Sequence, residues 1–216
     1  MVVKVDAGRV PEQRSLLYFP IVHTHADLGA LGDLVQRIKI KKLGKRAWSR
    51  NVRLIEDLWA RIEREVAGLN LNFERVRVYQ DGMPHCGHEI EIATELARAG
   101  SRNHQLLLSL HERGARIMGT ESPELLLEEY RQITKDLARE SGSDSGPAET
   151  ETSKETLLKR RDQYIAGQIN STLEDGETGI LFLGMLHSLT NLLAKDIRLV
   201  FPVDASSGNG GIVRDK

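Results

Sequence analysis

The sequence has little cysteine, no excess of either charge and no long apolar run. Its single cysteine, Cys86, excludes an internal disulfide, so we expect a protein of the reducing cytoplasm. Thirty Lys and Arg residues stand against thirty-one Asp and Glu residues, which leaves no general attraction to nucleic acid or to a membrane surface. The longest apolar run, residues 180–186, is far shorter than the roughly 18 residues that span a bilayer. Residues 1–14 lack the apolar core of a signal peptide. We therefore expect no membrane and no nucleic acid among its partners.

Five short segments have the apolar composition and the turn-forming boundaries of β-strands. They are residues 15–22, 75–80, 115–119, 179–184 and 197–202. The fourth segment carries large apolar residues on both faces, which predicts a strand that is buried on both sides. Pro20 counts against a fully paired central position for the first segment. The fifth segment is expected at a sheet edge.

Helical segments are expected between these strands. Apolar residues recur at steps of three and four over residues 52–66, 126–137 and 158–173, and shorter helices are expected at 28–43, 88–99, 102–113 and 187–195. Strands that alternate with helices predict an α/β fold with a mostly parallel central sheet of about five strands flanked by helices. We expect a single domain over residues 1–204, with a flexible insert at 141–153 and a mobile tail at 205–216.

Polar residues that suit a functional site follow the predicted strands. His23 and His25 follow the first strand, Asp81 the second, Glu121 the third and His187 the fourth. Ligands of a parallel sheet bind beyond the carboxyl ends of its strands, so we expect His23, Glu121 and His187 to converge there. The other reading is that each histidine is an ordinary polar loop residue. His104 and His111, on a predicted amphipathic helix, are expected at the surface or at its boundary.

Imidazole and carboxylate groups together suit a divalent transition metal such as zinc, manganese or cobalt. The predicted ligands are His23, Glu121 and His187, with His25 and Asp81 as auxiliaries. A second cluster, His85-Cys86-Gly87-His88, lacks the four ligands of a structural zinc site, and an ordinary loop before a helix is the favoured reading.

Two further patterns bear on phosphate ligands. The glycine-rich phosphate-binding motifs G-x-x-x-x-G-K-[ST] and G-x-G-x-x-G do not follow any predicted strand. Residues 37–53 carry eight Lys and Arg residues and no acid, which suits a phosphate-bearing ligand. A solvated helix face, offset by the acidic residues of 121–155, is the interpretation we favour at this point.

Residues 159–169, KRRDQYIAGQI, and residues 179–187, GILFLGMLH, resemble the carboxyl-terminal signature of the TraB-like proteins. In that signature an Arg-Asp or Arg-Asn pair on a helix precedes an apolar strand that ends in G-x-x-H. The superfamily also includes the Tiki proteases, the ChaN-like haem-binding proteins and the erythromycin esterases. The resemblance maps the family's arginine to Arg161 and its histidine to His187. At the first strand, His23 is kept but the family's Gly and Glu are absent, and Glu121 stands in as the acidic residue.

The resemblance implies a metal-dependent hydrolase with an active or a degenerate site. A metal-bound water would attack an acyl or phosphoryl centre of a small-molecule or peptide substrate, with Glu121 and Arg161 as catalytic residues. In this scheme Arg161 stabilises the developing negative charge. The alternative is a non-catalytic module that binds a small ligand or haem at the same position. His23-x-His25 also resembles, more weakly, the metal motif of amidohydrolases and PHP proteins. A homo-oligomer is compatible with either function.

Overall fold

The computed structural model describes residues 13–24, 44–140 and 151–203, together with residues 27, 32, 36, 37, 40 and 41. Within these residues, five parallel strands form one sheet in the order β3-β2-β4-β1-β5. The strands are β1 (Arg14–Ile21), β2 (Val76–Gln80), β3 (Arg116–Met118), β4 (Thr178–Gly184) and β5 (Ile197–Val200). The predicted α/β class and the parallel sheet are therefore confirmed.

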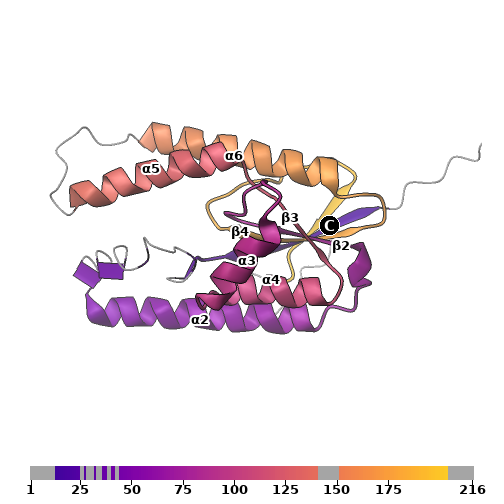
Figure 1. The fold of residues 1–216 in the computed structure, drawn as a ribbon, viewed down its shortest axis with the longest axis horizontal. Coiled ribbons are helices and arrows are strands. Elements are labelled where there is room, and N and C mark those ends of the chain that lie inside the picture. Colours follow the sequence, from indigo (N-terminus) through magenta and orange to yellow (C-terminus); the bar gives the residue numbers. More distant parts are fainter. Residues whose placement is uncertain are drawn as a thin grey trace, which may run out of the picture.

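Helices cover both faces of this sheet. They are α2 (Lys45–Ala67), α3 (Glu89–Arg98), α4 (Arg102–Glu112), α5 (Pro123–Glu140) and α6 (Glu151–Thr172), with a short 3₁₀ helix, η2 (Phe73–Arg75), before β2. Figure 1 shows α5 and α6 on one face and α2 and α4 on the other. None of the helices in the described part of the chain has the length and apolar character needed to cross a membrane.

The central position of β4 follows from its sequence. Ile180 and Phe182 belong to the core that includes Trp59 and Ile62 of α2. Leu181 and Leu183, which point the other way, belong to the core that includes Ile165 and Ile169 of α6. All four residues of this run are fully buried, because a β-strand alternates its side chains between two faces that are both covered by helices. The prediction of a strand buried on both sides is confirmed.

The pairing at one edge of the sheet explains why β1 tolerates Pro20. β1 pairs with β4 from Ser15 to Ile21, but its pairing with β5 ends where Leu17 faces Val200. Pro20 lies beyond that point, where β1 has only β4 as a neighbour and the missing amide N–H is tolerated. β5 forms one edge of the sheet, as the sequence predicts.

Four segments differ from the sequence-based expectations or lie wholly or partly outside the described residues. The helix expected at 187–195 is wrong: turns connect β4 to β5, and the Asn170 side chain of α6 holds the backbone of Leu192 and Ala194. The insert expected at 141–153 is shorter at its end, because α6 begins at Glu151, and residues 141–150 lie outside the described residues. Most of the helix expected at 28–43, and the tail at 205–216, also lie outside them.

The chain connections place a divergence point between β2 and β4. From β2 the chain continues through α3 and α4 to β3 at one edge, whereas from β4 it crosses to β5 at the opposite edge. The loops that leave these two neighbouring strands therefore separate at their carboxyl ends, and this is where open α/β sheets bind ligands.

Candidate functional site

Asp81 occupies the divergence point. It follows β2 directly, and its Oδ2 accepts a hydrogen bond of 2.8 Å from the backbone N–H of Gly184 at the end of β4. The same Oδ2 lies 3.1 Å from Nε2 of His23, which follows β1. The Asp81 side chain is only 4% exposed, whereas that of His23 is 37% exposed. A buried carboxylate thus orients an imidazole that remains open to solvent.

Arg161 of α6 connects Asp81 to two further carboxylates. Its Nε and Nη2 donate to Glu121 over 2.6 and 2.7 Å, and Nη2 also lies 3.0 Å from Asp81 Oδ1. Its Nη1 donates to Glu129 of α5. All three guanidinium nitrogens are therefore directed at carboxylates. The contact with Glu121 uses two nitrogens and two oxygens, and such paired hydrogen bonds are among the strongest arginine–carboxylate contacts.

Backbone pairing between two loops brings Glu121 to this position. The N–H of Glu121 donates to the carbonyl of Met83, and the N–H of His85 donates to the carbonyl of Glu121. The Gly82 N–H then donates to Glu121 Oε1 over 2.8 Å. The loop after β3 is in this way fixed to the loop after β2.

A second histidine–carboxylate pair lies behind Asp81. His187 Nδ1 is 2.6 Å from Oδ1 of Asp162 on α6, and its Nε2 is 3.7 Å from Asp81 Oδ1. Asp162 also accepts the backbone N–H of Ser188 over 3.1 Å. Since the side chains of His187 and Asp162 are both nearly buried, these hydrogen bonds fix the start of the loop that leaves β4.

Two glycines make this packing possible. A Cβ atom on Gly184 would lie 2.7 Å from Asp81 Oδ2, closer than any side chain tolerates. Gly82 has φ +77°, a conformation that glycine adopts without strain. The close approach of Asp81 therefore explains why residue 184, the first position of G-x-x-H, is a glycine in this chain.

Burial and neighbouring charges shift the pKa values of His23, Asp81 and Glu121. Burial lowers the pKa of His23, but the hydrogen bond with Asp81 and the negative charge of Asp81 together outweigh it, so that the pKa lies above its ordinary value. Burial likewise opposes ionisation of Asp81, yet the hydrogen bond and charge of His23 hold the pKa of that carboxyl well below its usual range. Burial raises the pKa of Glu121, and the Arg161 guanidinium opposes this effect.

Tyr18 of β1 also faces this group of charges. Burial, and after it the charges of Asp81 and Asp162, raise the pKa of Tyr18 to about 12. Its ring packs against Phe201 at a centroid distance of 5.1 Å. Tyr18 therefore belongs to the surroundings of the site on the β1 side.

The carboxylates do not offer free ligand positions for a metal ion. Both oxygens of Glu121 accept hydrogen bonds from Arg161 or Gly82, and both oxygens of Asp81 are engaged as well. Within the described ranges, no three His, Cys, Asp or Glu side chains are grouped so that they could hold a metal ion. The donor set does not fit a transition metal in this arrangement.

The predicted site residues that the structure describes come together. The structure brings His23, Asp81, Glu121, Arg161 and His187 to one end of the sheet through the contacts given above. His25 lies outside the described residues.

The sequence reasoning assigned no role to Asp162, Glu129 or Tyr18. Asp162 carried a detectable signal, because it lies four residues after Leu158 and three before Ile165, on the apolar stripe of its helix. A charge at such a position predicts a buried partner.

Three other histidines lie apart from these contacts. His104 was expected at the surface or its boundary, but it is buried, because α4 turns its first residues inwards and Ser101 Oγ lies 2.7 Å from its Nδ1. His85 and His88 are exposed. The loop between them is held by Glu89, whose Oε1 accepts hydrogen bonds from the N–H groups of Cys86 and Gly87.

No protein-family model, curated protein or solved structure matches this chain.

Proposed function

We propose that this protein is a hydrolase in which His23 acts as the general base that activates water. The observation that carries the proposal is the pair formed by His23 and Asp81, a solvent-accessible imidazole bound to a buried, anchored carboxylate. Histidine oriented by a carboxylate is a widespread device for proton transfer near neutral pH. The position of the pair, at the divergence point of the strand ends, supports the proposal further.

In this proposal the two ring nitrogens of His23 have different roles. When His23 donates its Nε2–H to Asp81, its Nδ1 carries the lone pair that accepts a proton from water. The water oxygen then bonds to an acyl or phosphoryl centre of a small-molecule or peptide substrate. The bond from that centre to its leaving group breaks, and the leaving group takes up the proton that His23 accepted. The imidazolium formed when His23 accepts the proton is stabilised by the negative charge of Asp81.

The remaining residues hold Asp81 in place. Arg161 and Gly184 hold the two oxygens of Asp81, and Glu121 in turn holds Arg161. In the proposed mechanism Arg161 and Glu121 are therefore positioning residues, because the nitrogens of Arg161 are directed at carboxylates rather than at the exposed side of His23.

The metal-dependent hydrolase implied by the TraB-like resemblance remains a prediction. It requires Glu121 to exchange Arg161 for a metal ion, and elemental analysis of the purified protein tests it directly. About one equivalent of zinc, manganese or cobalt per chain would assign water activation to the metal instead. An absorbance band typical of haem would favour the binding function.

Hydrolysis of p-nitrophenyl acetate and p-nitrophenyl phosphate tests the proposal. We expect His23→Gln to lower kcat/KM for the hydrolysed ester by about 100-fold or more, the usual contribution of a general base. His88→Gln is the matched control, since His88 is exposed and its side chain makes no capping hydrogen bond to α3. The wild-type rate should rise with pH around a midpoint above 6.5, the ordinary value for histidine.

Two results would contradict the proposal. One is equal activity of the wild type and His23→Gln, with folding confirmed by circular dichroism. The other is a wild-type protein that binds a small ligand but hydrolyses neither ester.

A further inference from the structure

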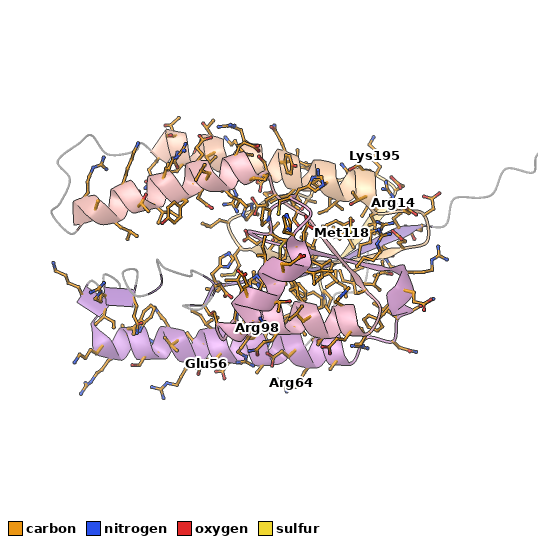
Figure 2. The ribbon with its side chains drawn as sticks, viewed as in Figure 1. Arg14, Glu56, Arg64, Arg98, Met118 and Lys195 are labelled. Carbon is orange, nitrogen blue, oxygen red and sulfur yellow. The ribbon has the colours of Figure 1, made fainter. Side chains whose placement is uncertain are left out.

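The first half of α2 carries a concentrated positive charge. Lys45, Arg46, Arg50 and Arg53 fall within its first nine residues, whereas the first acid of the helix is Glu56. All four cationic residues are exposed. Figure 2 labels Glu56 about halfway along α2 and Arg64 nearer its end, so the basic half is the half that extends past the sheet in Figure 1.

These cations have no acidic partners among the residues that the structure describes. Three of the acids of residues 121–155, which the sequence offered as an offset, form ion pairs on the opposite face of the sheet. Glu128 binds Arg160, Glu129 binds Arg161, and Asp136 binds Lys154 and Arg139, all within α5 and α6. These three acids therefore do not offset the cations of α2.

The same residues line a cavity of about 620 Å³ that is largely open to solvent. Its described lining consists of Lys45, Arg46, Ala47, Ser49, Arg50 and Arg53, which are four cations, one hydroxyl and one small side chain. This volume lies within the range of about 300–1,000 Å³ that small-molecule sites occupy. A cavity whose described charges are all positive favours an anion.

The start of the helix adds to this preference. The N-cap residue is Gly44, which has no side chain to satisfy the first N–H groups, and the first turn contains no acid. The positive end of the helix dipole and the four side-chain charges therefore act in the same direction. An oxyanion with several charges matches both.

We propose that this basic cavity at the start of α2 binds a small ligand that carries a chain of phosphate groups. Arg46, Arg50 and Arg53 recur at steps of four and three, and thus line one side of the helix over roughly 10 Å. Two or three successive phosphates span a comparable length. Guanidinium groups bind phosphate oxygens through paired N–H donors, which suits this ligand better than a single carboxylate.

A small ligand fits better than a nucleic acid strand. The only aromatic residue of residues 37–53, Trp48, is not among the described residues that line the cavity, so this described lining offers no surface for stacking bases. The formal charge of the whole chain is −1, which opposes the extended contact that a nucleic acid backbone requires.

Isothermal titration calorimetry with sodium tripolyphosphate tests the proposal. The site variant is Arg46→Glu/Arg50→Glu, and the control is Arg131→Glu/Lys195→Glu, which reverses two exposed cations elsewhere and changes the net charge equally. We expect the wild type to bind and the site variant to lose about tenfold or more in affinity, with less than about a twofold change in the control. Affinity should also fall between about 50 and about 200 mM NaCl.

Each other outcome overturns the proposal. Equal losses in both variants would mean that net charge alone attracts the anion. Absence of tripolyphosphate binding to the wild type would exclude the site. Binding of a single-stranded oligonucleotide without tripolyphosphate binding would replace the proposed ligand by nucleic acid. If the site variant fails to fold by circular dichroism, Arg46→Gln/Arg50→Gln keeps the helix propensity and makes the same measurement.

Discussion

The side chains of Arg161 and Glu121 form a two-point ion pair, with nitrogen–oxygen distances of 2.6 and 2.7 Å, inside the protein. The neighbouring residue on the same helix, Arg160, instead pairs with Glu128 at the surface. Adjacent arginines thus make the same type of contact in two different environments. Comparing the two arginines therefore measures how much more a buried ion pair contributes to the free energy of unfolding than an exposed one.

Replacing Arg161 by Met should destabilise the protein by about 3–5 kcal/mol, because it leaves Glu121 and Asp81 buried without their cation. Urea unfolding followed by circular dichroism measures this free energy. Arg160→Met is the matched control and should cost less than about 1 kcal/mol. Similar effects of the two substitutions would contradict a buried carboxylate network.

Asp162→Ala should lower the free energy of unfolding by about 1–3 kcal/mol, since the imidazole of His187 and the N–H of Ser188 lose their acceptor. Thermal and urea unfolding measure the loss. In nitrogen-15 NMR spectra, the signals of His187 should also change, because Asp162 accepts from Nδ1 and so selects the ring tautomer.

Glu155→Ala, at an exposed position of the same helix, is the control for Asp162→Ala and should stay within about 0.5 kcal/mol of the wild type. An unchanged His187 spectrum in Asp162→Ala would mean that another group orients this ring.

Gly184→Ala should destabilise the protein by about 1–3 kcal/mol, because the new methyl group would lie 2.7 Å from Asp81 Oδ2 and force that carboxylate to move. The displacement should also reduce ester hydrolysis through the loss of the His23–Asp81 contact. Gly167→Ala, within α6 and with open space at the Cβ position, should instead stabilise the protein by about 0.5–1 kcal/mol. If both substitutions changed the free energy of unfolding in the same direction, the close approach at Gly184 would be ruled out.

The titration of His23 should make the free energy of unfolding depend on pH. Its pKa is raised in the folded chain, so the stabilisation by the charged imidazole is complete below about pH 6.5 and is lost as the pH rises through the folded value. The difference in unfolding free energy between the wild type and His23→Gln should therefore shrink between acidic and alkaline pH. Urea unfolding at a series of pH values measures it.

Asp81→Asn gives a second, independent test of this titration. Without the carboxylate, burial becomes the dominant effect on His23, and its NMR titration midpoint should fall below 6.5. A midpoint that stays above 6.5 in this variant would assign the shift to a group other than Asp81.

The sequence by itself determined the five strands and the end of the sheet where polar residues gather. Strand β4 was predictable because its run of large apolar residues is a local property that demands burial on both faces. His23, Asp81, Glu121 and His187 were predictable as a group because each lies within about three residues of a strand end, and the ends of parallel strands meet.

Only the tertiary structure decided what these residues contact. The strand order makes β2 a neighbour of β4, and so brings Asp81 to the N–H of Gly184, 103 positions away in the chain. It also gives Glu121 to Arg161 instead of leaving it free as a metal ligand.

The turns at 187–195, where the sequence favoured a helix, have the same origin. Asp162 and Asn170 of α6 hold the backbone there through hydrogen bonds that no local pattern records. Periodicity reports which face of an element is buried, whereas the partners of a buried polar group depend on which distant elements the fold packs against it.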